Sequence, residues 1–423
     1  MQIDAIHIAA AVVFALALLH TFCAKRVEAI SHRGGPHAGL FHLLGEIEIV
    51  FGLWALVLLL LMAVLVDGHS ALEYAETRQY TEPIFVFVVM VVAASAPVLQ
   101  LVGALVGRLA RVMPVDNHLA ESWLGLSLVP LFGSLITEPA AMTLAALMLA
   151  PRVFAASMPE RVKYAALGVL FVNISIGGTL TSYAAPPVLM VATTWNWDTA
   201  FMASTFGWRA AIAVLVNATA FCWFARNAIK GHRAAIDEPV ASADPLPAAP
   251  LGVSLIHCGF LVLVIGFAHH PVILFATLLF FLGYTVAYAR YQSPLILKEA
   301  LLVAFFLAGL VVLGGMQQWW LQPIVSSLSP LALFFGATAL TALTDNAALT
   351  YLGSLIDGVG PASQYMLVAG AVTGGGLTVI ANAPNPAGVA LLRRGFAGAS
   401  IGMGALLVAA LAPTAVAAVM FLI

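Results

Sequence analysis

Long apolar runs without a charged residue constrain this chain more than any other feature of its sequence. Residues 49–66 and residues 84–107 contain no Asp, Glu, Lys or Arg, and each run is long enough to cross a bilayer as a helix. Of the 423 residues, 62% are hydrophobic and only 9% are charged, which excludes an ordinary soluble protein. A bilayer admits only helices or closed barrels, and these runs are too long for barrel strands. The sequence therefore predicts an all-α polytopic membrane protein.

A motif that carries an acid occurs twice inside otherwise apolar segments. Residues 137–143 read TEPAAMT and residues 344–350 read TDNAALT. The two copies match at a constant offset of 207 residues, which pairs Glu138 with Asp345. An ionisable residue inside a membrane is costly, and it is by default a candidate for function.

Each copy of the motif is followed by a glycine-rich apolar segment that prolines interrupt. Residues 177–187 read GGTLTSYAAPP, and residues 374–386 read GGGLTVIANAPNP. Each half of the chain thus has an acid-bearing segment followed by an interrupted helix. That arrangement in both halves is typical of the binding site of a secondary transporter.

We expect two inverted-topology repeats, with about ten spanning helices, two re-entrant hairpins and two broken helices in all. The first repeat comprises residues 1–229, with a hairpin at 121–154 and a broken helix at 162–194. The second comprises residues 253–423, with a hairpin at 330–357 and a broken helix at 362–392. The proline-rich residues 230–252 read as an exposed linker. The predicted spans are 3–23, 41–66, 84–107, 162–194, 205–228, 253–268, 271–289, 297–316, 362–392 and 401–422.

The distribution of basic residues favours hairpins that return to the side from which they entered. With such hairpins each half crosses about five times, and an odd number of crossings inverts the second half. All of the 17 Lys and Arg residues except Arg78 and Arg209 then lie on one face, as the positive-inside rule requires. Hairpins that crossed fully would destroy this bias. We therefore expect both termini in the periplasm and the linker in the cytoplasm.

The residue types at the hairpin tips and helix breaks suit a small hard cation. Glycines allow close backbone approach, and prolines leave carbonyl groups without helix partners. Carbonyl, hydroxyl and carboxylate oxygens are hard ligands. We pair Glu138 and Thr137 with the break at 177–182, and Asp345 and Asn346 with the break at 378–385. The predicted ion- and proton-binding residues are Glu138, Asp345, Asn346, Thr137, Thr344, Thr181, Ser182, Thr378, Asn382 and Asn385. The residues predicted to shape the broken backbone are Gly177, Gly178, Pro186, Pro187, Gly374, Gly375, Gly376, Pro384 and Pro386.

A buried carboxylate holds a proton tightly until a neighbouring cation displaces it, so one such group can exchange H+ for Na+. Other interpretations stay open. A membrane acid can instead bond to a backbone amide at a helix start. Glu46 and Glu48, near the cytoplasmic end of the second span, could function or simply reach water. Asn173, Ser175 and Asn217 could form polar contacts between helices.

The order of hairpin, broken helix and single span, repeated in inverted form, resembles the ion-transporter superfamily. GGTLT at 177–181 with APP at 185–187, and NAPN at 382–385, are similar to the two broken helices of that group, which includes sodium/proton antiporters, arsenite permeases and divalent-anion/sodium symporters. The whole chain is most similar to bacterial sodium/proton antiporters. The resemblance implies an elevator-like carrier, commonly a homodimer, without a cofactor or a metal other than transported Na+.

Two carboxylates at the tips attract a cation and repel a dicarboxylate, so we expect a Na+/H+ antiporter of the bacterial inner membrane. The alternative is an ion-coupled carrier of a small anion or oxyanion, of the carboxylate or arsenite type. Such a carrier needs a cationic group near the tips, and Arg209 lies near an outer helix end instead. We expect no enzymatic activity, since neither an HExxH nor a GxSxG motif occurs, and the nearly neutral net charge gives no argument for nucleic acid.

Overall fold

The computed structural model of the chain describes residues 5–31, 34–231 and 246–423. Every regular element in these ranges is a helix, as an all-α membrane protein requires. Most of the predicted linker, residues 232–245, lies outside the described residues.

The helices of the first half alternate between long apolar rods and short segments. They are α1 (Ala5–Ser31), α2 (Ala38–Gly45), α3 (Ile47–Leu65), α4 (Gly68–Glu76), α5 (Thr81–Ala93), α6 (Ala96–Val112), α7 (Asn117–Leu126), α8 (Leu128–Ile136), α9 (Glu138–Leu149), α10 (Glu160–Gly177), η1 (Gly178–Leu180), α11 (Pro186–Trp195), α12 (Thr199–Met202), η2 (Ala203–Gly207) and α13 (Trp208–Gly231).

The second half follows the same pattern. Its helices are α14 (Leu251–Gly266), α15 (Pro271–Ala287), η4 (Ala289–Tyr291), α16 (Leu297–Gly314), α17 (Gln318–Ser327), α18 (Pro330–Thr341), α19 (Asn346–Ser354), α20 (Pro361–Gly374), η5 (Val379–Ala381), α21 (Asn385–Leu392), η6 (Arg393–Gly395), η7 (Ala397–Ala399) and α22 (Met403–Leu422).

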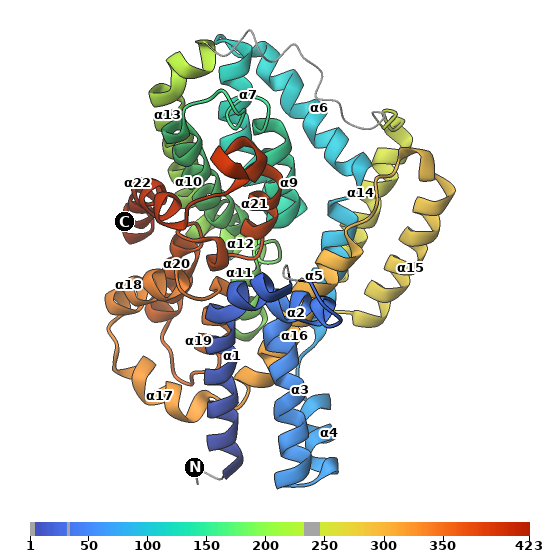
Figure 1. Cartoon of the computed structure of the whole chain (residues 1–423), viewed down its shortest axis with the longest axis vertical. Helices are drawn as coiled ribbons and strands as arrows, with labels where there is room; N and C mark the ends of the chain where they lie inside the picture. The colour runs from blue at the N-terminus through green and yellow to red at the C-terminus, as the bar shows by residue number, and fades with distance from the viewer. Residues whose placement is uncertain (1–4, 32–33, 232–245) are drawn as a thin grey trace.

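Two groups of helices pack side by side (Figure 1). In the first group, α3 packs on α1 and α16, and α5 packs on α14, α15 and α16. In the second group, α10 packs on α8, α13 and α22, and α18 packs on α20. The halves of the chain interlock within this second group, because α9 contacts α21 and α11 contacts α19. The groups meet where α5 contacts α9 and α11, and where α16 contacts α19.

Six helices of the described part are long and apolar enough to cross a membrane, or up to eight if each of two bent pairs forms one span. The chain is thus a multi-pass membrane protein. The predicted spans 253–268 and 271–289 correspond to the shorter apolar helices α14 and α15. The expected total of about ten spans remains a prediction.

Two predicted spans are interrupted in the structure. The span at 84–107 is divided into α5 and α6, which meet at an angle of 63°. Pro97 lies in the first turn of α6 and has no N–H group to continue the hydrogen bonding of α5. The span at 41–66 is likewise divided at Glu46, whose extended backbone separates α2 from α3.

Both predicted broken helices are interrupted at the expected places. The first consists of α10 and α11, with η1 and an extended segment between them. The second consists of α20 and α21, separated by η5. In both cases the second helix begins at the prolines predicted to shape the backbone.

Helices α3 and α16 approach each other so closely that their contact requires glycine. A side-chain carbon at Gly309 would overlap the backbone of Phe51 and Gly52. A side-chain carbon at Gly52 would overlap the ring of Phe305. These glycines hold α16 at the position from which it contacts α19.

We predict that Gly309→Ala lowers the thermal unfolding temperature of the detergent-solubilised protein. The added methyl group would force α3 and α16 apart, at a cost of about 1–3 kcal/mol. The control is Gly283→Ala in α15, where an added carbon meets no atom within 4 Å. This control should be neutral or stabilise by about 0.5–1 kcal/mol. Equal unfolding temperatures for the two variants would contradict the close contact.

Candidate functional site

The first acid-bearing turn is a single strained residue between two helices. Helix α8 ends at Ile136, and α9 begins at Glu138. Thr137 between them has φ 74° and ψ 152°, a region that β-branched residues rarely adopt. Only 2% of its surface is exposed, and its Oγ1 has no hydrogen-bond partner. Strain of this kind is typical of binding sites, where the surrounding structure over-determines the backbone.

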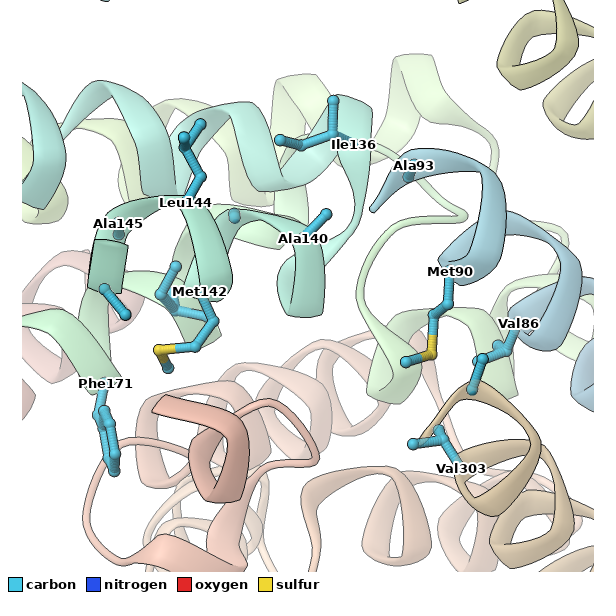
Figure 2. Packing of buried hydrophobic residues seen from close by; sticks show 14 of the residues in the cluster. Val86, Met90, Ala93, Ile136, Ala140, Met142, Leu144, Ala145, Phe171 and Val303 are labelled. Carbon is cyan, nitrogen blue, oxygen red and sulfur yellow. The ribbon is translucent and has the colours of Figure 1, made fainter. Parts of the chain in front are cut away.

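Glu138 is completely buried next to this turn. Its Oε2 accepts a hydrogen bond of 2.7 Å from Asn382 Nδ2, and its Oε1 has no partner. No Lys, Arg or His of the described residues forms an ion pair with it. The helix that Glu138 begins packs in an apolar cluster: Figure 2 shows Ala140 and Met142 of α9 on one side, with Met90 of α5 and Val303 of α16 opposite.

Both broken helices contribute to the environment of Glu138. A side-chain carbon at Gly178 would lie 2.6 Å from Glu138 Oε1, so the first break packs directly against the carboxylate. This contact agrees with the expected pairing of Glu138 with residues 177–182. The hydrogen bond from Asn382 was not expected, because Asn382 lies on the break of the other half.

Ser134 attaches the first acid-bearing turn to the first break, and the sequence analysis missed it. Its Oγ donates to Gly177 O at 2.7 Å and accepts from Leu180 N at 2.9 Å. Thr181 Oγ1 in turn donates to Ser134 O at 2.7 Å. The only signal in the sequence is one hydroxyl in the apolar helix α8, four residues before Glu138.

In the second acid-bearing turn the carboxylate takes a different place. Asp345 is the N-cap of α19, and its Oδ1 accepts hydrogen bonds from Ala347 N at 2.8 Å and Ala348 N at 3.2 Å. Its side chain therefore satisfies backbone amides that a helix start leaves free. This is the alternative role that the sequence left open for a membrane acid.

Asn346, and not Asp345, occupies the helix position that Glu138 has in the first half. Both are the first residue of the returning helix, and both are completely buried. Both also lie against a glycine of a break, since a side-chain carbon at Gly375 would lie 2.9 Å from Asn346 Nδ2. The equivalence of the two turns is thus shifted by one residue relative to the repeat of the sequence. One turn presents a carboxylate, and the other presents a neutral amide.

The second break is held together by its own polar residues. Asn385 Nδ2 donates to Gly375 O at 2.8 Å and to Thr378 O at 2.9 Å. Thr378 Oγ1 donates to Ala342 O, in the second turn, at 2.9 Å. Of the two asparagines in this break, Asn382 bonds to the acid and Asn385 holds the backbone.

Two predicted site residues point elsewhere. Ser182 Oγ lies 3.3 Å from Thr199 Oγ1, and both line a cavity with Asp198 and His269. Thr344 Oγ1 donates to Leu340 O within its own helical turn. The structure does not bring either hydroxyl to Glu138.

The other polar residues noted in the sequence connect helices. Asn217 Nδ2 donates to Asn173 Oδ1 at 2.9 Å, and Asn173 Nδ2 donates to Leu126 O at 2.7 Å. Ser175 Oγ donates to Val372 O at 2.7 Å and so connects α10 of the first half to α20 of the second. These contacts agree with the interpretation of these side chains as polar contacts between helices.

A group of buried polar atoms around the two turns has no hydrogen-bond partner. Such groups are rare in folded proteins and call for a ligand or another explanation. All but one of these atoms are oxygens, which are the ligands that a hard cation prefers. The atoms are Thr137 Oγ1, Glu138 Oε1, Thr341 Oγ1, Asn346 Oδ1 and Nδ2, Thr373 Oγ1, Asn382 Oδ1 and Asn385 Oδ1.

We predict that Thr137→Gly raises the thermal unfolding temperature in detergent, because glycine adopts φ 74° without strain. The strain removed is about 1–3 kcal/mol, less about 0.5–1 kcal/mol for the greater freedom of unfolded glycine. Thr137→Ala removes the same hydroxyl but keeps a Cβ atom at this φ, so it should not stabilise the protein. A lower unfolding temperature for Thr137→Gly than for Thr137→Ala would contradict the strain.

The comparison with protein families identifies the chain as a transporter. A family model described as "Putative Na+/H+ antiporter" matches residues 5–423. No curated protein matches the chain. The crystal structure of the YdaH transporter of Alcanivorax borkumensis is similar, with a TM-score of 0.43 and 16% identity over 89% of this chain and 96% of that chain. Because the family model covers the chain almost from end to end, the protein belongs to that transporter family.

Proposed function

We propose that this protein exchanges Na+ for H+ across the bacterial inner membrane by alternating access, and that Glu138 is the group that carries the ion. The supporting observation is the state of Glu138, which is fully buried, has one unpartnered oxygen and forms no ion pair with any described residue. An unpaired buried charge costs several kcal/mol. The carboxylate therefore needs either a proton on it or a cation beside it.

The neighbours of Glu138 assign a role to each oxygen. Asn382 Nδ2 donates to Oε2 and fixes the orientation of the carboxylate. Oε1 then holds the proton in one state and faces Na+ in the other. Thr137 Oγ1 and Asn382 Oδ1, both buried and unpartnered, are the nearest candidates for further Na+ ligands. Gly178 allows the first break to approach Oε1.

The second turn provides a neutral half of the site in this proposal. Asn346 offers an amide in place of a carboxylate, and Asn385 Oδ1 and Thr341 Oγ1 are unpartnered near it. Asp345 caps α19, and it would add its negative charge to the attraction of a cation. An anionic substrate would be repelled by Glu138, so the geometry favours a cation over the carboxylate or arsenite alternative.

The remaining parts of the proposal follow from the topology and from the resemblance to the ion-transporter superfamily. The helices that carry the two turns and breaks, in two inverted repeats with re-entrant hairpins, would move together against the group built on α3, α5 and α16. Both termini would lie in the periplasm.

We predict that Glu138→Gln abolishes Na+-evoked proton movement in proteoliposomes, measured with a pH-sensitive dye. Glutamine keeps the shape of the side chain but can neither release a proton nor neutralise Na+. The control is Glu73→Gln on α4, where the side chain is 69% exposed and the flux should be unchanged. Undiminished flux in Glu138→Gln would remove this residue from the mechanism.

Asp345→Asn should have a smaller effect than Glu138→Gln. Asparagine is as good an N-cap as aspartate, so α19 should keep its start and lose only the charge. We expect proton movement to persist, with a several-fold higher Na+ concentration for half-maximal flux. Complete loss of flux in Asp345→Asn, with retained thermal stability, would show that Asp345 carries the ion as well.

The Na+ dependence of the flux should change with pH. If one proton and one Na+ compete for Glu138, lowering the pH by one unit should raise the Na+ concentration for half-maximal flux by up to about tenfold. The maximal flux should be less affected. An unchanged half-maximal concentration between pH 6 and pH 8 would contradict competition at one carboxylate.

A further inference from the structure

A cavity of about 330 Å³ brings charged residues at the start of α3 and α16 together with neighbours of Glu138 and Asn382. Its lining includes Pro139 and Ala383, which directly adjoin Glu138 and Asn382 in the chain. It also includes Glu46, Glu48, Lys298 and Glu299. We call this cavity the acidic vestibule.

A second, small cavity lies next to the acidic vestibule at the first acid-bearing turn. Its volume is about 10 Å³, which is about the space that one water-sized species occupies. It shares Met90, Pro139 and Val303 with the vestibule, and it is also lined by Thr137. Thr137 is the buried residue whose Oγ1 has no partner. Three side chains therefore separate the vestibule from a small cavity that contacts this residue, next to Glu138 in the chain.

The lining of the vestibule has more negative than positive groups. Three carboxylates face one ammonium group, and Lys298 Nζ donates to Glu46 Oε1 at 3.0 Å. His42 Nε2 also lies 3.7 Å from the same oxygen. Glu46 is therefore paired. Glu299 lies beside Lys298 on the exposed first turn of α16.

Among the described residues, Glu48 is the partly buried carboxylate of the vestibule that has no partner of opposite charge. It forms no ion pair with any residue in the part of the chain that the structure describes. The charged residues that line the vestibule with it are Glu46, Lys298 and Glu299.

A third cavity, between α5, α11, α16 and α19, has no lining residue from the two acid-bearing turns. It has a volume of about 450 Å³. Its lining includes Arg78 and Glu82, and on α19 it includes only Tyr351, Ser354 and the following Leu355. Tyr351 Oη donates to Val311 O at 3.1 Å, which joins α19 to α16 at this cavity. Of the acidic vestibule and this third cavity, the vestibule is the one whose lining includes a direct chain neighbour of Glu138.

We propose that the acidic vestibule is the entrance through which the monovalent cation reaches Glu138, and that Glu48 determines its selectivity for positive charge. This inference rests on the proposed function for the identity of the ion. Glu48 would raise the local concentration of cations in the vestibule and lower that of anions. Thr137 lines the small cavity next to it. A single charge about 10 Å away in a water-like medium changes the local concentration of a monovalent ion about twofold. The ratio of cation to anion then changes about fourfold.

The experiment measures this ratio without using transport. Cys23, Cys222 and Cys258 are replaced by alanine, and Ala387→Cys is introduced at an exposed position that lines the vestibule. The rates of modification by a positively charged trimethylammonium thiosulfonate and by a negatively charged sulfonate thiosulfonate of similar size are compared. The cationic reagent should react faster, and Glu48→Gln should lower the ratio of the two rates about fourfold. Glu82→Gln, an acid of the opposite cavity, is the matched control and should leave the ratio unchanged.

A ratio that is the same with and without Glu48→Gln, or an introduced thiol in Ala387→Cys that neither reagent modifies, would overturn the proposal. Oriented proteoliposomes supply a second readout. Glu48→Gln should raise the Na+ concentration for half-maximal flux severalfold when Na+ is added on the vestibule side, and should have no effect when it is added on the other side. An equal effect from both sides would contradict an entrance role. If the unmodified protein shows no Na+-evoked proton movement, the proposed function fails, while the labelling ratio still decides the charge selectivity of the vestibule.

Discussion

The architecture of this protein depends on one unpaired carboxylate in an apolar interior. Glu138 begins a helix, α9, whose Ala140 and Met142 belong to the apolar core, and an asparagine from the opposite half of the chain is the one side-chain hydrogen-bonding partner of its carboxylate among the described residues. Without a proton or a cation such a charge would cost several kcal/mol. The strained Thr137, the glycine packed against Oε1 and the two interrupted helices all serve to place polar atoms around this group. A packing of apolar helices alone would not require these features.

The two halves of the chain build related but unequal sites. Each presents the first residue of a returning helix to a glycine of a broken helix. In the first half this residue is Glu138, and in the second it is Asn346, with the acid displaced to the N-cap. Of the two acids at these turns, only Glu138 is fully buried. Hydrogen bonds also join the two halves. Asn382 of the second break donates to Glu138, and Ser175 of α10 donates to α20.

The sequence predicted the all-α membrane fold, and it singled out the glycine- and proline-rich segments that separate α10 from α11 and α20 from α21. The repeated motifs made this possible, because an acid, two glycines and paired prolines within apolar segments have few structural roles. The ion-binding roles of the residues around Glu138 remain predictions. The sequence could not predict the shift of one residue at the second turn, because the matching letters of the two motifs align Glu138 with Asp345 and not with Asn346. The hydrogen bond from Asn382 and the role of Ser134 depend on how helices that are distant in the chain pack together. The spacing of residues along the sequence does not reveal this packing. The divided span at Pro97 was overlooked, although proline there removes a backbone donor.

The most direct test of the central claim is the number of protons released when Na+ binds to the detergent-solubilised protein, measured in weakly buffered solution with a pH indicator. If Glu138 holds either a proton or Na+, binding should release protons from the unmodified protein in proportion to the Na+ bound, and Glu138→Gln should release none. Na+ binding without proton release, or equal release from both proteins, would contradict the account.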